Sequence, residues 1–183
     1  MLDPSTQSEP TLHRFRLQFV LILFNVSLSG CSALSSLFEP DPPPPPAPTI
    51  VHLKMETAKN SNATTDGTGA PLVARYYELK SSNAFTNADF FAMYDQDKSI
   101  LGGDIVFREE LELIPGTSRE IKLKPKPESR FIGVFGAFRD LETAQWRAVE
   151  KIPPNKTTEM NILFTKNAVT IKATEEKPPS EKK

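Results

Sequence analysis

The segment 131–138, Phe-Ile-Gly-Val-Phe-Gly-Ala-Phe, decides how this chain must fold. Side chains alternate between the two faces of a β-strand, so Phe131 and Phe135 would share one face while Ile132 and Val134 share the other. Both faces are apolar, and a strand that is apolar on both faces needs a covering layer on each side. The segment therefore predicts a central strand, buried within a larger β-structure.

Other segments on both sides of this strand carry short apolar patterns typical of strands, and turn residues separate them. In 119–124, Arg-Glu-Ile-Lys-Leu-Lys, Ile121 and Leu123 share one face, and Pro115-Gly116 ends the strand before it. The expected strands lie at 50–55, 72–79, 110–114, 119–124, 131–138, 146–152, 160–164 and 169–171. Such a series of short strands with frequent turns predicts an all-β, two-sheet sandwich over residues 49–173.

One segment, 82–100, lacks the two-residue period of a strand. Its apolar and small residues instead follow helical spacing, at Phe85, Ala88, Asp89, Phe91 and Ala92. We expect a short helix near 87–94, capped by Asn83 or Thr86 and followed by a turn at 95–97. The aromatic residues of this helix are expected to pack it on the sandwich, and they are Phe90, Phe91 and Tyr94.

A polar insertion, 59–71, separates the first two expected strands and reads Lys-Asn-Ser-Asn-Ala-Thr-Thr-Asp-Gly-Thr-Gly-Ala-Pro. Hairpin connections usually take about two to five residues, and longer structureless loops tend to be functional or disordered. The residues alone leave both interpretations open, a binding loop or a flexible connection without a role.

The amino-terminal part has the layout of a secretory signal. Basic residues His13, Arg14 and Arg16 precede the apolar run 17–28, and the only cysteine ends the stretch Leu28-Ser29-Gly30-Cys31. The run is shorter than the roughly 20 residues that a transmembrane helix needs. Leu-Ser-Gly-Cys resembles the lipobox of bacterial lipoproteins, which implies a signal peptide at 1–30 and acylation of Cys31.

Two polar or proline-rich segments flank the expected sandwich. Residues 31–48 would be the acylated cysteine and a linker rich in proline, which favours an extended conformation that reaches up to roughly 50 Å. Residues 174–183 are too polar to pack and are predicted to be disordered. We therefore divide the chain into signal peptide, linker, sandwich and tail.

Composition argues against several functions. Lys and Arg (22) balance Asp and Glu (23), so nothing indicates nucleic-acid binding. The segment from Asp95 resembles the start of a calcium loop, but Ile100 and Val106 stand where that loop needs Gly and Glu. Glu110 and Glu112 share a strand face, which we interpret as solvated rather than catalytic. With no recognisable nucleophile and base, we expect no enzyme activity, metal, cofactor or small-molecule substrate.

Several segments, in the right order, resemble one family, the type VI secretion lipoprotein TssJ, also called SciN or VasD. They lie at 75–81, 85–95, 108–111 with Pro115-Gly116, 132–134, 137–140 and Trp146-Arg147. The resemblance spans about residues 50–172 and includes the lipobox. It implies a transthyretin-like sandwich of two four-stranded sheets with a short helical addition.

The resemblance also implies a function. Family members are outer-membrane lipoproteins that face the periplasm and bind the periplasmic part of TssM, joining TssL in a complex that anchors an injection machine. The loop between the first two strands makes this contact in the family. No motif matches there, so its candidates are positional: Asn60, Thr64, Thr65, Asp66, Gly67 and Thr68.

The alternative is a periplasmic lipoprotein that binds sugar or peptidoglycan on the same scaffold. Such a protein would expose aromatic side chains for stacking on sugar rings. The candidates Tyr76, Tyr77 and Trp146 lie in expected strands, where core packing is the simpler account.

Overall fold

The computed structural model describes residues 43–175, so the predicted signal peptide, lipobox, Cys31 and most of the predicted tail lie outside the described residues. The strands and helices all belong to one compact unit that begins at Pro46. None of the helices described within it is long and apolar enough to cross a bilayer.

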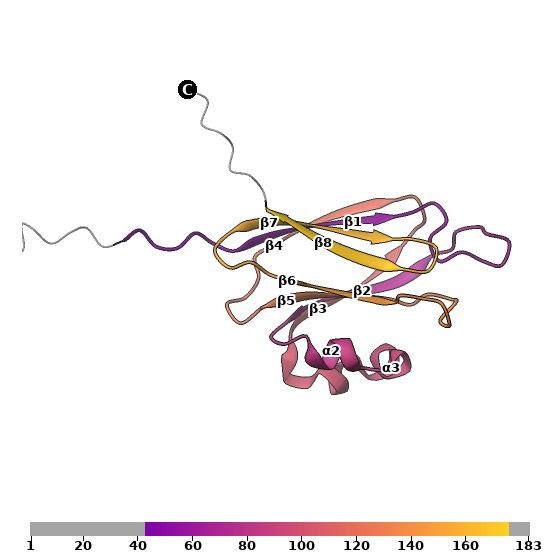
Figure 1. The fold of residues 1–183 in the computed structure, drawn as a ribbon, viewed down its shortest axis with the longest axis horizontal. Helices are drawn as coiled ribbons and strands as arrows, with labels where there is room; N and C mark the ends of the chain where they lie inside the picture. Colours follow the sequence, from indigo (N-terminus) through magenta and orange to yellow (C-terminus); the bar gives the residue numbers. More distant parts are fainter. Residues whose placement is uncertain (1–42, 176–183) are drawn as a thin grey trace, which may run out of the picture. The chain divides into compact units, whose positions relative to one another are not determined.

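The domain is a sandwich of two four-stranded sheets (Figure 1). In spatial order, the first sheet contains β4 (Ser118–Leu123), β1 (Ile50–Thr57), β7 (Thr157–Phe164) and β8 (Val169–Glu175). The second contains β3 (Ile105–Leu113), β2 (Leu72–Leu79), β5 (Phe131–Gly136) and β6 (Arg147–Lys151). β1 and β7 pair in parallel, and the other neighbours are antiparallel. The predicted all-β sandwich is confirmed, although β3 begins at Ile105 rather than Glu110.

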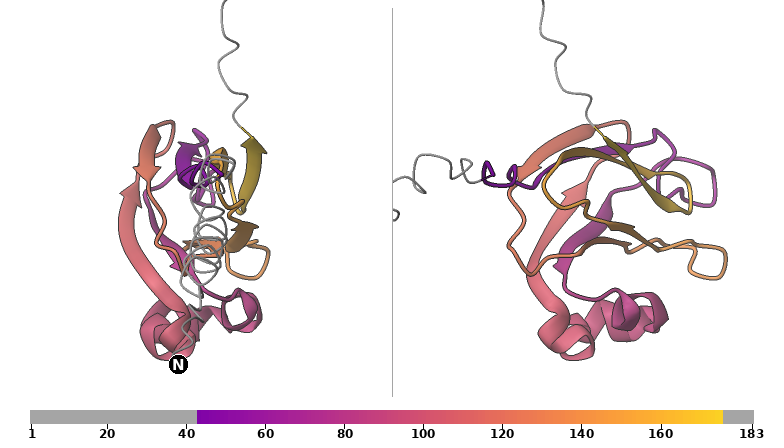
Figure 2. Two further views of the ribbon diagram at one scale, coloured as in Figure 1. Left: turned by 90° about the vertical axis from the view of Figure 1, so that its left-hand side faces the viewer. Right: turned by 60° about the vertical axis from the view of Figure 1, so that its left-hand side comes forward.

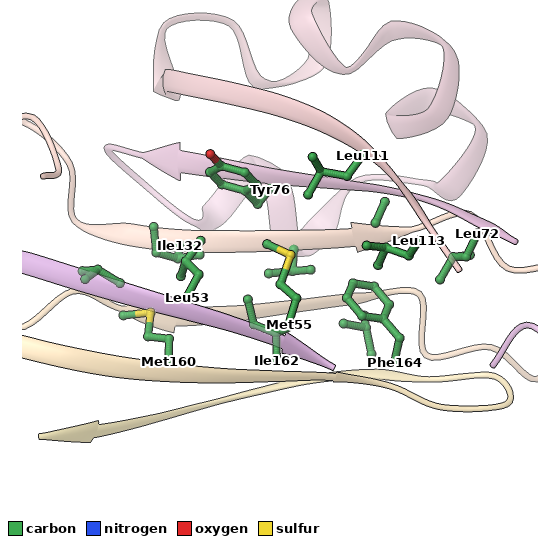
Figure 3. Packing of buried hydrophobic residues seen from close by; sticks show 14 of the residues in the cluster. Leu53, Met55, Leu72, Tyr76, Leu111, Leu113, Ile132, Met160, Ile162 and Phe164 are labelled. Atoms are coloured by element: carbon green, nitrogen blue, oxygen red, sulfur yellow. The ribbon is translucent and has the colours of Figure 1, made fainter. Parts of the chain in front are cut away.

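Strand β5 lies between β2 and β6, as its apolar faces require. Ile132 and Val134 belong to the core between the sheets. Figure 3 shows Ile132 with Leu53 and Met160 facing it from the other layer. Phe135 belongs to a second apolar cluster on the outer face. Burial on both faces therefore comes from a second sheet on one side and helices on the other.

The helices α2 (Asn83–Asn87) and α3 (Phe90–Leu101), with the 3-10 turn η2 (Gly102–Asp104), cover the outer face of the second sheet (Figures 1 and 2). The buried side chains of these helices include Phe85 of α2 and Met93 and Leu101 of α3. These residues pack on Tyr77, Leu79 and Phe135 of β2 and β5.

The predicted single helix at 87–94 has the wrong bounds. Two helices meet at Ala88-Asp89, because the Asp89 carboxylate accepts hydrogen bonds from the amides of Phe91 and Ala92, at 2.9 and 3.3 Å, and begins a new helix. The predicted caps are also wrong, since the Thr86 hydroxyl donates to a preceding carbonyl and Ser82 stands at the start of α2. The turn expected at 95–97 lies inside α3, where Gln96 alone departs from helical geometry.

Of the three helix aromatics, Phe90 packs as predicted, 5.4 Å from Phe135 and 5.3 Å from Trp146 between ring centres. Phe91 remains 62% exposed and Tyr94 42%. The expectation that all three would pack on the sandwich is therefore wrong for Phe91 and only partly met by Tyr94, which stacks on Phe90.

Candidate partner-binding loops

Four connections gather at one end of the sandwich, at 58–71, 114–117, 137–146 and 165–168 (Figure 1, right). We call this the loop end. The chain enters β1 at the other end, through Pro46–Thr49, because β1 runs the length of the sandwich before it reaches residue 58. The predicted binding loop therefore lies opposite the point where the chain enters the domain.

The base of the 58–71 loop is packed and hydrogen-bonded. Ser61 and Asn62 are buried, and Asn62 adopts a left-handed conformation with φ of 49°. The Asn62 side chain donates to the Pro71 carbonyl at 2.7 Å and accepts from the Arg139 amide at 2.8 Å. Asn tolerates this backbone region, so it can join the loop to the neighbouring 137–146 connection. The interpretation of a loose connection is not supported for this base.

Gly69 shows how closely the two arms of the loop approach. A Cβ atom at this position would lie 2.2 Å from the Lys59 carbonyl oxygen and 2.9 Å from Pro115 Cβ. Any larger residue would push the arms apart, because the nearest atom belongs to the backbone and cannot rotate away.

The tip of the loop is organised around Asp66. Its carboxylate accepts from the Thr64 hydroxyl and from the Thr68 amide and hydroxyl, both at 3.2 Å. These hydrogen bonds, that from Thr64 above all, lower the pKa of Asp66. Gly67 provides the turn with a φ of 86°, and the Thr64 amide closes it on the Thr68 carbonyl at 2.8 Å. Four of the six positional candidates thus form one small hydrogen-bonded turn.

The remaining two candidates, Asn60 and Thr65, are exposed on the same loop. Beside the tip lies a hollow of about 380 Å³, lined by Ala63, Thr64, Thr65, Arg139, Asp140, Lys166 and Asn167. Sequence reasoning missed the contribution of Arg139 and Lys166. Both follow strand ends at a turn, but the sequence does not show which strand ends meet.

A charged cluster, formed by Asp97, Arg75, Arg108 and Glu110, lies between α3 and the second sheet. Asp97 is buried and accepts from the Tyr77 hydroxyl at 2.8 Å and from Arg108 Nε at 2.6 Å. Arg75 donates to Glu110 at 2.8 Å and to the carbonyls of Met93 and Tyr94. The Glu110 side chain is 46% exposed, as expected for a solvated strand face, and it also pairs with Arg75 and Arg108. Each group binds another group of the cluster, so its geometry serves the fold.

The pKa values in this cluster follow its pairing. Burial by itself would raise the pKa of Asp97, but hydrogen bonds from Arg108 and Tyr77 outweigh it and hold the pKa below its ordinary value. The hydrogen bond from Arg75 lowers the pKa of Glu110. Burial, with the hydrogen bond to Asp97, raises the pKa of Tyr77. Across residues 43–175, His, Cys, Asp and Glu form no group of three that could hold a metal ion.

The aromatic residues proposed for sugar stacking are used inside the fold. Tyr76 and Tyr77 are buried in β2. Trp146 packs edge-on to Phe90 and Phe135, and the Arg147 guanidinium lies 4.3 Å from the centre of its ring. None of the three offers an open ring face of the kind a sugar platform needs.

The fold and its loop end define a class of protein, a β-sandwich that presents a structured loop on a rigid scaffold. A family model, T6SS-SciN, described as type VI secretion lipoprotein, VasD, EvfM, TssJ, matches residues 49–174. The chain therefore belongs to the type VI secretion lipoprotein family.

Solved structures agree with this assignment. The T6SS lipoprotein TssJ1 from Pseudomonas aeruginosa is 38% identical, with a TM-score of 0.68 over 71% of this chain and 99% of that one. A chain of a type VI membrane complex is 28% identical, with a TM-score of 0.59 over 68% and 98%. A chain in the structure of the TssM C-terminal domain from EAEC is 28% identical, with a TM-score of 0.57 over 67% and 99%. A search of curated proteins found no significant match.

Proposed function

We propose that this chain is an outer-membrane lipoprotein of the type VI secretion membrane complex that binds the periplasmic part of TssM. Residues 1–30 are its signal peptide, with Leu28, Ser29 and Gly30 as lipobox. Acylated Cys31 holds the protein in the bilayer, and the linker to residue 48 carries the domain into the periplasm. TssL joins through the complex, and the chain makes or breaks no covalent bond.

The observation that carries this proposal is the structured 58–71 loop at the end of the sandwich opposite the chain entry. The Asp66 turn and the Asn62 bridge already order this loop in the free protein. A preordered loop loses less conformational entropy on binding, so more of its contact energy appears as affinity. The similarity to a chain in a TssM structure indicates the partner.

The geometry also suits a tethered protein. An eight-residue strand such as β1 spans about 23 Å, so the loop end lies roughly that far from the entry of the linker. Tethering confines the domain near its partner, and a modest contact then acts as a strong one through effective concentration. The protein therefore presents the 58–71 loop at the end of the domain opposite the residues through which the linker enters.

The tip of the loop can be tested without damaging its base. The combined variant Thr64→Ala, Asp66→Ala, Thr68→Ala removes the hydrogen-bonded turn and leaves buried Ser61 and Asn62 in place. We expect its affinity for the periplasmic part of TssM to fall by about 10- to 100-fold in calorimetry, the size of a few important interface contacts. A deletion of the whole loop would be less clear, because it removes the buried residues as well.

The matched control is Asp95→Ala, Ser99→Ala, Thr174→Ala, three exposed residues outside the loop end. It should bind TssM like the unmodified chain. Equal affinity of all three proteins would place the interface elsewhere. The anchor is tested separately: Cys31→Ser should abolish acylation in mass spectrometry and release the protein from the membrane fraction.

A further inference from the structure

The end of the sandwich at which the chain enters is basic. Its two segments 124–130 and 151–156 hold five exposed cations and a single acidic residue, namely Lys124, Lys126, Arg130, Lys151, Lys156 and Glu128. We call these two segments the basic end. The neighbouring connections add Lys80 and Asp104, whose charges balance.

The loop end carries no such excess. Its four connections contain three cations and three anions, namely Lys59, Arg139, Lys166, Asp66, Asp140 and Glu142. The connecting segments at the two ends therefore differ in charge, although Glu78 of β2 and Glu175 of β8 offset two of the cations at the basic end. The whole chain has a formal charge of only −1.

Buried contacts fix the basic end in one shape. Glu78 is 5% exposed, and its carboxylate accepts from the Ser129 hydroxyl at 2.6 Å and from the Lys126 amide at 3.2 Å. The Ile152 amide donates to the Arg130 carbonyl at 2.8 Å and so joins the two segments. The lysines therefore project from a structured platform. Lys156 contributes least, because it pairs with Glu175 at 2.6 Å.

The linker leaves the domain within this platform. Ala47, Pro48 and Thr49 line a hollow of about 670 Å³ together with Lys126, Arg130 and Lys151. The basic end is therefore the end of the domain at which the linker attaches, and the loop end is the opposite one.

We propose that the basic end binds the anionic phospholipid headgroups of the bilayer that holds the anchor. This inference rests on the proposed function, because the acylation of Cys31 identifies the bilayer that the basic end would contact. The electrostatic contact would act in addition to the acyl anchor. Each Lys or Arg close to an anionic surface strengthens binding by roughly fivefold. The contact would keep the basic end against the membrane and the loop end directed away from it.

The test uses residues 32–183, which lack Cys31, so that acylation plays no part. The solved TssJ1 chain is 99% covered by its match to this chain, so it consists almost entirely of the matched part. Circular dichroism of residues 32–183 will verify that this shortened chain is folded. We expect it to co-sediment with phosphatidylglycerol-containing vesicles but not with pure phosphatidylcholine vesicles. Binding should weaken strongly between about 0.01 and 0.15 M salt, as the Debye length falls from about 30 to about 8 Å.

The variant Lys124→Gln, Lys126→Gln, Lys151→Gln should lower the partition by roughly 100-fold, since three cations are lost. The control Lys54→Gln, Lys98→Gln, Lys172→Gln makes the same change in net charge elsewhere on the surface and should bind normally. Equal loss in both variants, or equal binding to both kinds of vesicle, would overturn the proposal.

Measuring TssM binding and vesicle binding on both variants distinguishes a failure of the lipid proposal from a failure of the proposed function. The basic-end variant should keep its affinity for TssM, while the loop-tip variant should keep its affinity for vesicles. If the basic-end variant instead loses TssM and keeps the vesicles, the basic end is a protein interface and the lipid proposal is wrong. In that case, loss of TssM binding by the loop-tip variant would still support the proposed function, because that variant leaves the basic end unchanged.

Discussion

Asp97 is a charged side chain of α3 that joins this helix to the sheet beneath it. It accepts hydrogen bonds from Tyr77 on β2 and Arg108 on β3, and Arg75 lies 3.6 Å away. Removing one partner of a buried charged group leaves the others without compensation, which costs more than the bond itself contributes. A single residue on the helix therefore influences the stability of the whole outer layer.

Asp97→Asn should lower the free energy of unfolding by about 2–3 kcal/mol at pH 7, measured by urea denaturation. Because the folded state lowers the pKa of Asp97, its carboxylate stabilises the fold above the ordinary value of 3.8, and this is lost as the pH falls through the lower folded value. The difference between the two proteins should therefore shrink below about pH 4. The exposed control Asp95→Asn should change little, and a pH-independent difference would contradict this account.

At the scale of the elements, the contacts of α3 explain why this helix extends beyond its predicted end at residue 94. The carbonyls of Met93 and Tyr94 accept from Arg75 of β2, and the Lys98 amide donates to the Asp97 side chain at 2.8 Å. These contacts satisfy backbone groups around Gln96, so the helix continues past a position where its geometry breaks. Rules based on neighbouring residues do not include an arginine from a distant strand. The sequence therefore predicted a turn at 95–97, where the helix in fact continues.

Asp89 caps the start of α3 through its carboxylate, which accepts from the Phe91 and Ala92 amides. Asp89→Ala should lower the free energy of unfolding by about 1 kcal/mol, the usual cost of losing an N-terminal cap. Hydrogen exchange of the Phe91 and Ala92 amides should also become faster. Asp95→Ala, in the same helix but outside the cap, is the comparison; if both variants lose the same stability, the cap is not the cause.

At the scale of the whole molecule, one apolar core joins the two sheets. β7 contributes Met160, Ile162 and Phe164 to it, and each is at most 1% exposed, whereas Leu163 between them is 39% exposed. β1 and β7 pair in parallel at the centre of the first sheet, so segments about 100 residues apart in the sequence contact each other directly. The core therefore depends on long-range pairing.

Ile162→Ala should lower the free energy of unfolding by about 2–4 kcal/mol and lower the melting temperature, because it leaves a cavity between the sheets. Leu163→Ala changes the adjacent residue on the opposite face and should cost less than about 1 kcal/mol. Similar losses in the two variants would show that β7 does not bury the side that the structure assigns to it.

Much of the fold was predictable because strands carry their burial pattern locally. The alternation in 131–136 placed Ile132 and Val134 on one face and Phe135 on the other, and both faces are buried as expected. The site was predictable only in outline: the length of 59–71 marked the loop, but its buried base at Ser61 and Asn62 was not foreseen. The Asn62 side chain accepts from the Arg139 amide, and the loop sequence alone does not place Arg139 beside it.

The sequence by itself determined the approximate strand positions, the all-β class and the family, because periodicity and short motifs are properties of neighbouring residues. Only the tertiary structure decided which strands pair, that the 58–71 loop and the chain entry lie at opposite ends, and that basic residues gather at one of them. Those features depend on contacts between segments far apart in the chain, and their free energy exists only once the sheets have packed.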